Sequence, residues 1–358
     1  MLPVAAYTDD AVLAWERGHL FDHGWTCVGR AAELAEPGDQ RAERGLLLVR
    51  SDDLILRAFA NVCSHRGHEL LSAGETVCRP SVRCPYHGWT YDLDGSVRNA
   101  PGGVPSPDDW PLVSLPIVEW LGWLFVNASG DAAPIDEQLV GLDTILGPYE
   151  PGRLASLARH EYDVRANWKV INENYQECLH CPRIHPELCR VSPPESGDNV
   201  QPGPRWVGGW MDLRDDAATM SMTGELAGVP LPGLDETARR RVAYFAVLPD
   251  LLVSAHPDYV LTHRLVPLAP DCTHVECEWL ADPSVTSLDG AVDLWDITNR
   301  QDWAACESVQ RGLSSAGARP GPITVREDAV HHLVSTIATA YLADDHLFGH
   351  GPTAGVGS

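Results

Sequence analysis

Two short pairs of Cys and His constrain this chain more than any other feature of its sequence. Cys63 and His65 form the first pair, Cys84 and His87 form the second, and residues 66–83 separate them. Thiolate sulfur and imidazole nitrogen are both strong metal ligands. Each pair follows an extended apolar run. The fold must therefore bring two loops together around one metal centre.

This ligand set suits a Rieske [2Fe-2S] cluster, in which two cysteines hold one iron and two histidines hold the other. A structural zinc site uses the same residue types, but the intervening segment lacks the ligand-bearing helix of a zinc finger. Trp89, Thr90 and Tyr91, followed by the turn signal Asp94-Gly95, predict a β-hairpin beneath the second loop. The iron-sulfur interpretation is favoured, although the ligands alone do not exclude zinc.

The residues around these ligands resemble one branch of the Rieske family. The segments Cys-x-His-Arg-Gly and Cys-Pro-Tyr-His-Gly-Trp are similar to those of ring-hydroxylating oxygenases. The respiratory branch has two further cysteines in these loops, where this sequence has His68 and Tyr86. The resemblance implies an all-β N-terminal domain that passes single electrons. The absence of the two further cysteines disfavours the respiratory branch.

A second cluster of metal-binding residue types begins at Glu177. Glu177 and His180 are three residues apart and would share a helical face. On an ideal helix His185 would point away from them. However, Pro182 distorts the turn, and Pro186 disfavours the α conformation at His185. The chain can therefore bend His185 back towards His180, so that two histidines converge on one metal.

A 2-His-1-carboxylate site needs one acidic ligand and leaves open positions on Fe(II). Asp302 is the stronger candidate, because it lies on the apolar stripe of a predicted helix, where an unpaired carboxylate is costly. That stripe continues through Cys306, Val309 and Leu313. Asp296 is the alternative, but it lies nearer the predicted helix start, where acidic residues commonly interact with the helix dipole.

With this second motif the resemblance extends over nearly the whole chain, to the α subunit of Rieske non-haem iron oxygenases. It implies an α+β chain with a Rieske domain and a catalytic domain, whose antiparallel sheet is flanked by helices. By position, His180, His185 and Asp302 would hold a mononuclear Fe(II) that activates O2. Glu177 would link His180 to His87 of the partner subunit in a head-to-tail homotrimer.

The bridging residue narrows the resemblance further. Most ring hydroxylases have Asp at this position, whereas this chain has Glu177. The surrounding segments Glu-Asn-Tyr-x-Glu-Cys-x-His-Cys and His-Pro-Glu-Leu-Cys-Arg are similar to the branch that contains choline monooxygenase, glycine-betaine demethylase and carnitine oxygenase. This implies hydroxylation of a quaternary or methylated amine, with formaldehyde released when an N-methyl group is hydroxylated.

Hydroxylation of an aromatic or natural-product substrate is the alternative. A Rieske electron carrier is the non-enzyme alternative, which the second motif disfavours.

A quaternary ammonium ion requires an aromatic cage, because cation–π attraction replaces the hydrogen bonds that this cation cannot make. The aromatic candidates are Trp206, Trp210, Tyr244, Phe245 and Tyr259. Ordinary core packing is the competing interpretation for each of them. We expect His256 and His263 to be structural or surface residues and not extra ligands. Three cysteines near the iron motif are expected to be packing residues, namely Cys178, Cys181 and Cys189.

Four parts are expected along the chain. These are an N-terminal helix that packs on the catalytic domain (residues 1–23), the Rieske domain (24–133), the catalytic domain (134–350) and a flexible tail (351–358). Alternating apolar runs predict antiparallel strands in the catalytic domain, at residues 241–248, 259–266 and 274–280.

Charge and motif content exclude several classes of function. The formal charge of 26 − 50 = −24 repels nucleic acid and anionic membranes. No segment approaches the roughly 18 apolar residues of a membrane span, and the start lacks the basic region of a signal peptide. We therefore expect a cytoplasmic protein. Because no dinucleotide-binding or P-loop motif is present, electrons from NAD(P)H should arrive through a separate flavin/iron-sulfur reductase, as the resemblance implies.

Overall fold

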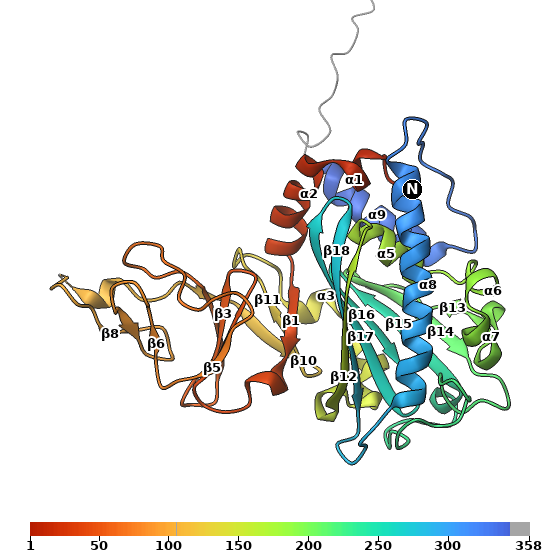
Figure 1. The fold of residues 1–358 in the computed structure, drawn as a ribbon, viewed down its shortest axis with the longest axis horizontal. Coiled ribbons are helices and arrows are strands. Elements are labelled where there is room, and N and C mark those ends of the chain that lie inside the picture. The colour runs from red at the N-terminus through yellow and green to blue at the C-terminus, as the bar shows by residue number, and fades with distance from the viewer. Residues whose placement is uncertain (105, 344–358) are drawn as a thin grey trace, which may run out of the picture. The chain divides into compact units, whose positions relative to one another are not determined.

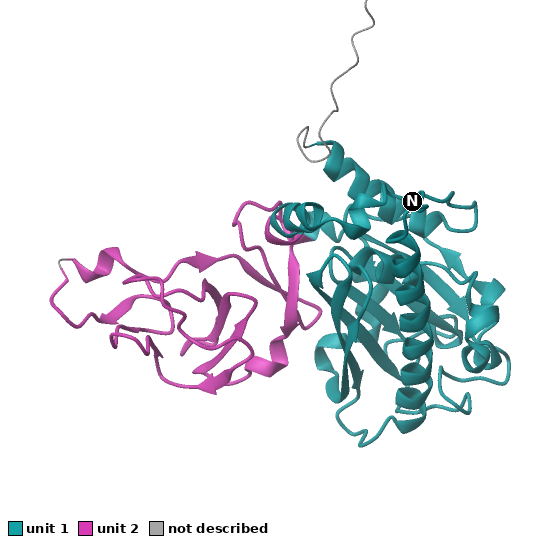
Figure 2. Cartoon of the chain, turned by 45° about the horizontal axis from the view of Figure 1, so that its top comes forward, with its two compact units in different colours: residues 1–20, 136–358 teal, residues 21–135 magenta. Residues whose placement is uncertain are grey.

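The structure is a computed structural model that describes residues 1–104 and 106–343. The chain forms two compact units (Figure 2). Unit 2 contains Phe21–Ile135, and unit 1 contains Met1–Leu20 together with the chain from Asp136 onward. The expected flexible tail, residues 351–358, lies outside the described residues.

Unit 2 consists mainly of short antiparallel strands (Figure 1). These are β1 (Thr26–Arg30), β2 (Asp39–Glu43), β3 (Leu46–Arg50), β4 (Leu56–Ala60), β5 (Thr76–Cys78), β6 (Val82–Arg83), β7 (Thr90–Tyr91), β8 (Val97–Asn99), β9 (Ser114–Leu115), β10 (Ile117–Trp120) and β11 (Trp123–Val126). They form sheets of order β1-β11-β10, β5-β2-β3-β4-β9 and β6-β7-β8. The pairing of β7 with β8 contains the predicted hairpin.

Strand β3 separates two hydrophobic cores of unit 2. It is the middle strand of the five-stranded sheet, and its side chains alternate between two cores. Leu47 and Val49 pack in the core that also contains Cys63 and Cys84. Leu48 packs in a separate core on the other face. The predicted ligand loops therefore rest on a buried apolar layer.

Unit 1 is built on one seven-stranded antiparallel sheet. Its strands are β12 (Ala155–Val164), β13 (Asp198–Asn199), β14 (Trp206–Asp212), β15 (Arg241–Val247), β16 (Leu251–Ala255), β17 (Tyr259–Ala269) and β18 (Cys272–Ala281). Their order is β12-β18-β17-β16-β15-β14-β13. The predicted antiparallel sheet is confirmed, and the three predicted runs correspond to β15, β17 and β18.

The helices are α1 (Ala5–Thr8), α2 (Asp10–Glu16), α3 (Ile135–Gln138), α4 (Leu142–Leu146), α5 (Trp168–Tyr175), α6 (Cys181–Ile184), α7 (Pro186–Val191), α8 (Asp289–Leu313) and α9 (Asp328–Leu342). Helix α8 contacts α5, α7 and β12, and in Figure 1 it runs along the sheet. None of the helices in the described part of the chain is long and apolar enough to cross a membrane.

The buried stripe of α8 differs from the predicted one at a single position, Val309. Val309 is 44% exposed, whereas Cys306, Gln310 and Leu313 are buried. Gln310 is four residues after Cys306 and continues its face, whereas Val309 is turned towards solvent. The prediction was therefore wrong at Val309. Gln310 is retained in the core by hydrogen bonds, since its Oε1 accepts from the Asn167 backbone at 3.0 Å.

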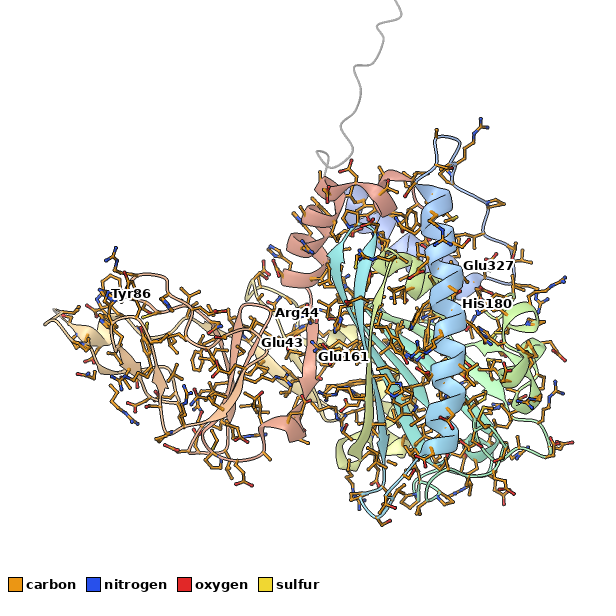
Figure 3. All side chains as sticks on the ribbon, in the orientation of Figure 1. Glu43, Arg44, Tyr86, Glu161, His180 and Glu327 are labelled. Atoms are coloured by element: carbon orange, nitrogen blue, oxygen red, sulfur yellow. The ribbon has the colours of Figure 1, made fainter. Side chains whose placement is uncertain are left out.

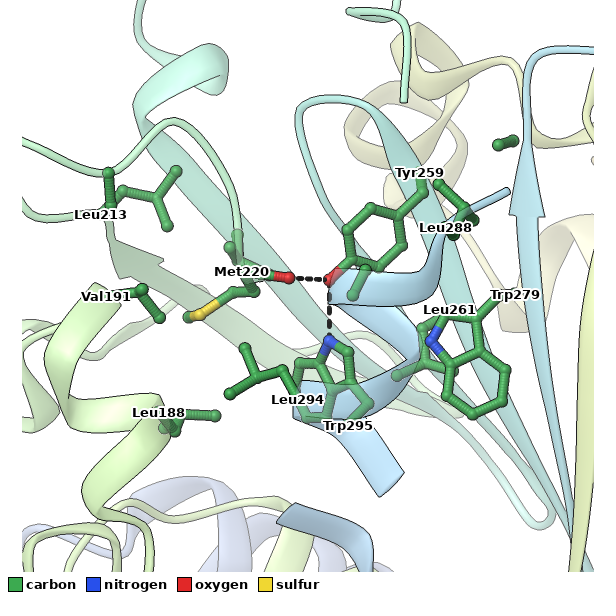
Figure 4. Packing of buried hydrophobic residues seen from close by; sticks show 14 of the residues in the cluster. Leu188, Val191, Leu213, Met220, Tyr259, Leu261, Trp279, Leu288, Leu294 and Trp295 are labelled. Carbon is green, nitrogen blue, oxygen red and sulfur yellow. Dashed lines mark hydrogen bonds between the residues drawn. The ribbon is translucent and has the colours of Figure 1, made fainter. Parts of the chain in front are cut away.

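The core of unit 1 joins α8 to the sheet. Trp295 of α8 donates from Nε1 to the Tyr259 hydroxyl at 2.8 Å, and that hydroxyl donates to the Met220 carbonyl at 2.6 Å (Figure 4). These bonds satisfy polar groups that would otherwise be costly to bury. They fix the orientation of α8 on β17.

The N-terminal segment packs within unit 1. It forms two helices and not one, because Asp9 caps a new helix by accepting from the Ala11 backbone at 2.7 Å. At the end of α2, the fully buried Glu16 carboxylate lies 2.6 Å from Lys169 Nζ. It also accepts from Trp168 Nε1 at 2.8 Å. A buried carboxylate and ammonium are tolerable only as such a hydrogen-bonded pair, so this contact ties α2 firmly to α5.

Candidate functional site

The three proposed iron ligands converge in unit 1. The ligand atoms of His180, His185 and Asp302 all lie within 4.8 Å of one another. His185 Nε2 is 2.9 Å from Asp302 Oδ1, and His180 Nε2 is 3.4 Å from the same oxygen. His180 precedes α6, His185 lies between α6 and α7, and Asp302 lies on α8. Figure 3 labels His180 beside α8.

The bend that brings the histidines together occurs at His185, as predicted from Pro186, whereas Pro182 lies in the first turn of α6 and does not interrupt that helix. His185 has φ −119° and ψ 65°, outside the α region, directly before Pro186. Glu177 and His180, however, do not share a helix, since α5 ends at Tyr175. The Glu177 carboxylate accepts hydrogen bonds from the backbone of Leu179 and His180. Such side-chain bonds compete with helix formation, and the result is a turn.

Both histidines are held by their Nδ1 atoms. His180 Nδ1 lies 2.5 Å from Glu177 Oε1, and His185 Nδ1 lies 2.7 Å from Gln301 Oε1. Gln301 Nε2 donates to Glu187 at 3.3 Å, which identifies its Oε1 as the acceptor. Each Nδ1 therefore carries the proton, and each Nε2 can direct a lone pair at a metal.

The charges around the three ligands favour a divalent cation. Burial opposes ionisation of Asp302, but hydrogen bonds with His180 and His185 lower its pKa to about 2. Burial also opposes a positive charge at His180, but Asp302 and Glu177 raise its pKa to about 10, which shows that the two carboxylates stabilise positive charge at this point of the site. The Asn174 amide donates to Asp302 Oδ1 at 2.8 Å. Two imidazoles and one carboxylate in this arrangement fit the ligand set of a non-haem Fe(II) site.

Asp296 is not part of this cluster. It accepts from the Tyr162 hydroxyl at 2.6 Å and from Arg300 Nε at 2.8 Å. Helix α8 begins at Asp289, so Asp296 lies two turns into the helix and not near its start. Its carboxylate is stabilised by Arg300 one turn further along. Of the two aspartates, the structure brings only Asp302 to the histidines.

The proposed cluster ligands of unit 2 occupy two loops. Cys63 and Cys84 are buried, whereas His65 and His87 are exposed. The two imidazole rings have their centroids 4.7 Å apart. Burial is the largest cause that raises the pKa of the Cys63 thiol, and the neighbouring Cys84 thiol adds to it. The two thiols are therefore shielded from solvent, whereas the two neighbouring imidazoles face it.

The two loops have the same backbone hydrogen bonds. The N–H of Cys63 and that of Cys84 each donate, at 2.8 Å, to the carbonyl five residues further on. In each loop the fourth residue after the cysteine is a glycine, Gly67 or Gly88, with φ of 70° and 75°. Only glycine adopts this conformation without steric cost. The glycines within both motifs are therefore needed to shape the loops.

A cavity of about 360 Å³ adjoins the three ligands in unit 1. Its aromatic lining consists of Tyr175, Trp210, Tyr244, Trp295 and Trp303. Trp210 and Tyr244 were predicted cage residues. The other three candidates, Trp206, Phe245 and Tyr259, are not among the described residues that line it.

Strand alternation explains part of this difference. Tyr244 and Phe245 are adjacent on β15 and point to opposite faces of the sheet. Phe245 is fully buried and packs edge-on against Trp206, with ring centroids 5.7 Å apart. The hydroxyl of Tyr259 already donates to the Met220 carbonyl and accepts from Trp295 Nε1 within the core (Figure 4). Core packing is therefore the role that the structure shows for these three side chains.

The two remaining histidines are structural and buried, so the surface alternative is wrong. His256 stacks on the Tyr259 ring, with centroids 4.0 Å apart. His263 lines the cavity, and its Nε2 lies 3.0 Å from Asn299 Oδ1. Burial lowers the pKa of His263 to about 4, so it is neutral at physiological pH. Neither joins the cluster of candidate metal ligands in the described chain.

Comparison with known families identifies the class of this protein. Residues 24–116 match the Rieske [2Fe-2S] domain, and residues 151–343 match the catalytic domain of ring hydroxylating alpha subunits. The chain belongs to the ring hydroxylating alpha subunits and is a Rieske non-haem iron oxygenase. Its cofactors are accordingly a [2Fe-2S] cluster and a mononuclear iron, and it uses O2 with electrons from a reductase. The zinc and electron-carrier alternatives are thereby excluded.

Several relatives are named for quaternary amines. The glycine betaine monooxygenase oxygenase subunit of Chromohalobacter salexigens is 30% identical over 369 residues, covering 90% of this chain and 81% of the relative. The carnitine monooxygenase oxygenase subunit of Acinetobacter baumannii is 39% identical over 196 residues, covering 51% and 52% of the two chains. A solved quaternary ammonium Rieske monooxygenase has a TM-score of 0.82 and 26% identity, with 94% of each chain covered.

The fold is shared more widely than the substrate. Naphthalene 1,2-dioxygenase from Rhodococcus sp. has a TM-score of 0.79 at 19% identity, and the match covers 96% of this chain and 94% of that protein. This likeness shows the fold alone.

Proposed function

We propose that this chain is the terminal oxygenase that hydroxylates a quaternary or methylated amine, with oxidative N-demethylation as the reaction at an N-methyl group. The observation that carries the proposal is the cavity beside His180, His185 and Asp302, which combines aromatic walls with an excess of acidic side chains. The relatives named for glycine betaine, carnitine and choline support the same substrate class.

The aromatic walls suit a cation that cannot donate hydrogen bonds. Tyr175 and Tyr244 meet edge to face, with ring centroids 6.0 Å apart, and Tyr244 meets Trp295 in the same way at 6.3 Å. Rings held in this manner have little freedom to turn. The face of an aromatic ring attracts a cation, and the attraction is larger in a site that excludes water.

The charged residues of the lining also favour a cation. Apart from the residues around the iron site, the charged side chains that line the cavity are Glu195, Asp198, Arg326 and Asp328. Three are acidic and one is basic. A lining of predominantly one sign raises the local concentration of ligands of opposite charge. Arg326 can donate hydrogen bonds to the carboxylate of a zwitterionic amine, while the acidic majority of the lining still favours its cationic group.

The chain's own residues have distinct proposed roles. His180, His185 and Asp302 would hold the mononuclear iron, while Glu177 and Gln301 orient the two imidazoles. In unit 2 the four loop ligands, Cys63, His65, Cys84 and His87, would hold the cluster. When bound, the cluster supplies single electrons and the mononuclear iron supplies activation of O2. A hydroxylated N-methyl group then collapses to formaldehyde and the demethylated amine.

We also propose a homotrimer in which Glu177 links His180 to His87 of the partner subunit. The hydrogen bond between Glu177 and His180 and the exposure of the histidine loops support this assignment. Mixed oligomers test it. Cys84→Ser subunits lack a cluster and His185→Ala subunits lack the iron, so activity should return in mixtures only if electrons cross between subunits. A cytoplasmic location and a flavin/iron-sulfur reductase remain predictions.

The substrate class is tested by a product screen. Iron-loaded protein would be combined with a surrogate reductase, NADH and O2, and offered choline, betaines, carnitine and simple aromatics. We expect formaldehyde together with a demethylated amine, both measured by mass spectrometry. Oxygen insertion into an aromatic compound without formaldehyde would instead establish the alternative substrate class.

A further inference from the structure

Two cysteines flank the iron ligand His180 in a Cys-x-x-Cys arrangement. Cys181 donates its backbone N–H to the Cys178 carbonyl at 3.3 Å, which closes a turn. Such a turn keeps the two Cα atoms within roughly 7 Å, and disulfides require a separation of roughly 4.4–6.8 Å. The backbone therefore already holds the pair near the geometry of a disulfide.

The two cysteines lie in the same cavity as the proposed iron ligands. Cys181 Sγ lies 3.9 Å from His180 Nε2, and Cys178 Sγ lies 3.3 Å from Met211 Sδ. The third cysteine of this region is directed differently, since Cys189 Sγ donates to the Cys181 carbonyl at 3.4 Å. Any oxidant formed in the cavity therefore meets two adjacent thiols and one thioether.

We propose that Cys178 and Cys181 form a reversible disulfide, with hydrogen peroxide as the oxidant. Peroxide is the two-electron reduction product of O2, which this class of enzyme consumes. One thiol sulfur attacks a peroxide oxygen, so that the O–O bond breaks and a sulfenic acid and water result. The second thiol attacks the sulfenic sulfur, so that the S–S bond forms and a second water leaves. The thiols lose two electrons and two protons, and peroxide becomes two waters.

The disulfide protects the surroundings of the iron site. Oxidation of Met211 to its sulfoxide would place a polar group against the cavity wall. A disulfide consumes the same oxidant at neighbouring sulfurs and is restored by an ordinary thiol reductant. This chemistry is independent of which amine enters the cavity, so it stands apart from the proposed substrate.

Peptide mapping tests the disulfide directly. The iron-loaded protein would be exposed to peroxide, alkylated and digested with trypsin. Cys178 and Cys181 then lie in one peptide, residues 170–183, whereas Cys189 lies in the next, residues 184–190. We expect peptide 170–183 to lose two hydrogen atoms and resist alkylation until dithiothreitol is added. Cys189→Ser is the matched control and should leave this result unchanged.

Two outcomes would overturn the proposal. In the first, both thiols of peptide 170–183 remain open to alkylation at peroxide doses that oxidise the exposed Cys78. In the second, the link joins Cys189 to either of them. A second measurement follows Met211. In a Cys178→Ser protein, Met211 sulfoxide should appear at lower peroxide than in the unchanged protein, and equal doses would argue against protection.

Discussion

The cluster loops of unit 2 and the iron site of unit 1 are built in different ways. Each cluster loop contains its own Cys and His pair and the backbone hydrogen bonds that shape it. The iron site instead joins His185 to Asp302 across 117 positions of the chain. A local loop keeps its shape when distant parts change, whereas a non-local site depends on how α8 packs against α5 and α7. Packing changes in unit 1 should therefore affect the iron and spare the cluster.

Removal of one ligand from each site should give the largest effect. His185→Ala should lose the mononuclear iron and lower turnover by at least ~1,000-fold, because the metal provides the reactive centre. The visible and electron paramagnetic resonance spectra of the cluster should remain unchanged. Cys84→Ser is the counterpart and should lose those spectra while mononuclear iron is retained. If either variant lost both metals, the two sites would not be independent.

The same contrast explains what the sequence could predict. The spacing of Cys63, His65, Cys84 and His87 indicates one site because every ligand lies in a short motif. Asp302 was predicted because it lies on the apolar stripe of its helix. The structure brings this aspartate to the two histidines, although Val309 does not belong to that stripe. The helical geometry predicted for Glu177 was wrong, because its carboxylate bonds to the backbone of the following turn.

Other parts of the iron site carry no comparable signal. Asn174 and Gln301 contact the ligands through amides, and an amide has no motif that marks it as a metal-site residue. Trp295 was not predicted for the cavity, but it lies seven residues before Asp302 and thus on the same helical face. That spacing could have identified it. The bonds of Tyr259 could not have been predicted, because Met220 reaches it through the tertiary fold.

Gln301 provides the second test of the comparison. Gln301→Ala should weaken iron binding by roughly 10- to 100-fold, the usual effect of removing a partner of a metal-bound histidine. The cluster should be unaffected. Iron titration under anaerobic conditions measures the change. Thr298→Ser, also on α8 but without contact to a ligand histidine among the described interactions, is a suitable control. Equal losses in both variants would point to general weakening of α8.

The stability of unit 1 should depend on pH through a buried carboxyl group, Glu173, and a pH series should reveal this dependence. Burial raises the pKa of Glu173 in α5 to about 7, despite the opposing hydrogen bond from Tyr7 and the charge of Lys169. A carboxyl with a raised pKa stabilises the fold fully below its unfolded value near pH 4.5 and loses that contribution as pH rises to about 7. The loss should be up to about 2 kcal/mol, reduced by partial exposure of the side chain.

Calorimetry between pH 5 and pH 8 measures this loss. The unfolding transition of unit 1 should move to lower temperature as pH rises, and Glu173→Gln should flatten that trend. Asp296→Asn is a control. Burial opposes ionisation of Asp296, but hydrogen bonds from Arg300 and Tyr162 lower its pKa, so this carboxyl affects stability only in more acidic solution. An unchanged slope in Glu173→Gln would assign the pH dependence to other groups.

The smallest expected effect concerns the cavity wall. Tyr244→Leu should raise KM for a quaternary amine by roughly tenfold, which is the loss of one desolvated cation–π contact. Tyr244→Phe keeps the ring and should behave like the unchanged protein, since the Tyr244 hydroxyl has no hydrogen-bond partner among the described residues. Steady-state kinetics with both variants measures the difference. If both variants raised KM equally, the hydroxyl and not the ring would contact the substrate.

The double role of helix α8 limits how enzymes with this fold can acquire new substrates. It provides a proposed iron ligand at Asp302, the hydrogen-bond partner of His185 at Gln301 and part of the cavity wall at Trp295. A change on its inner face therefore alters substrate selectivity and iron retention together. Strands β14 and β15 contribute Trp210 and Tyr244 to the same cavity without supplying any of the proposed iron ligands. New substrate ranges should thus arise mainly through changes in these two strands, while α8 remains under the joint demands of both tasks.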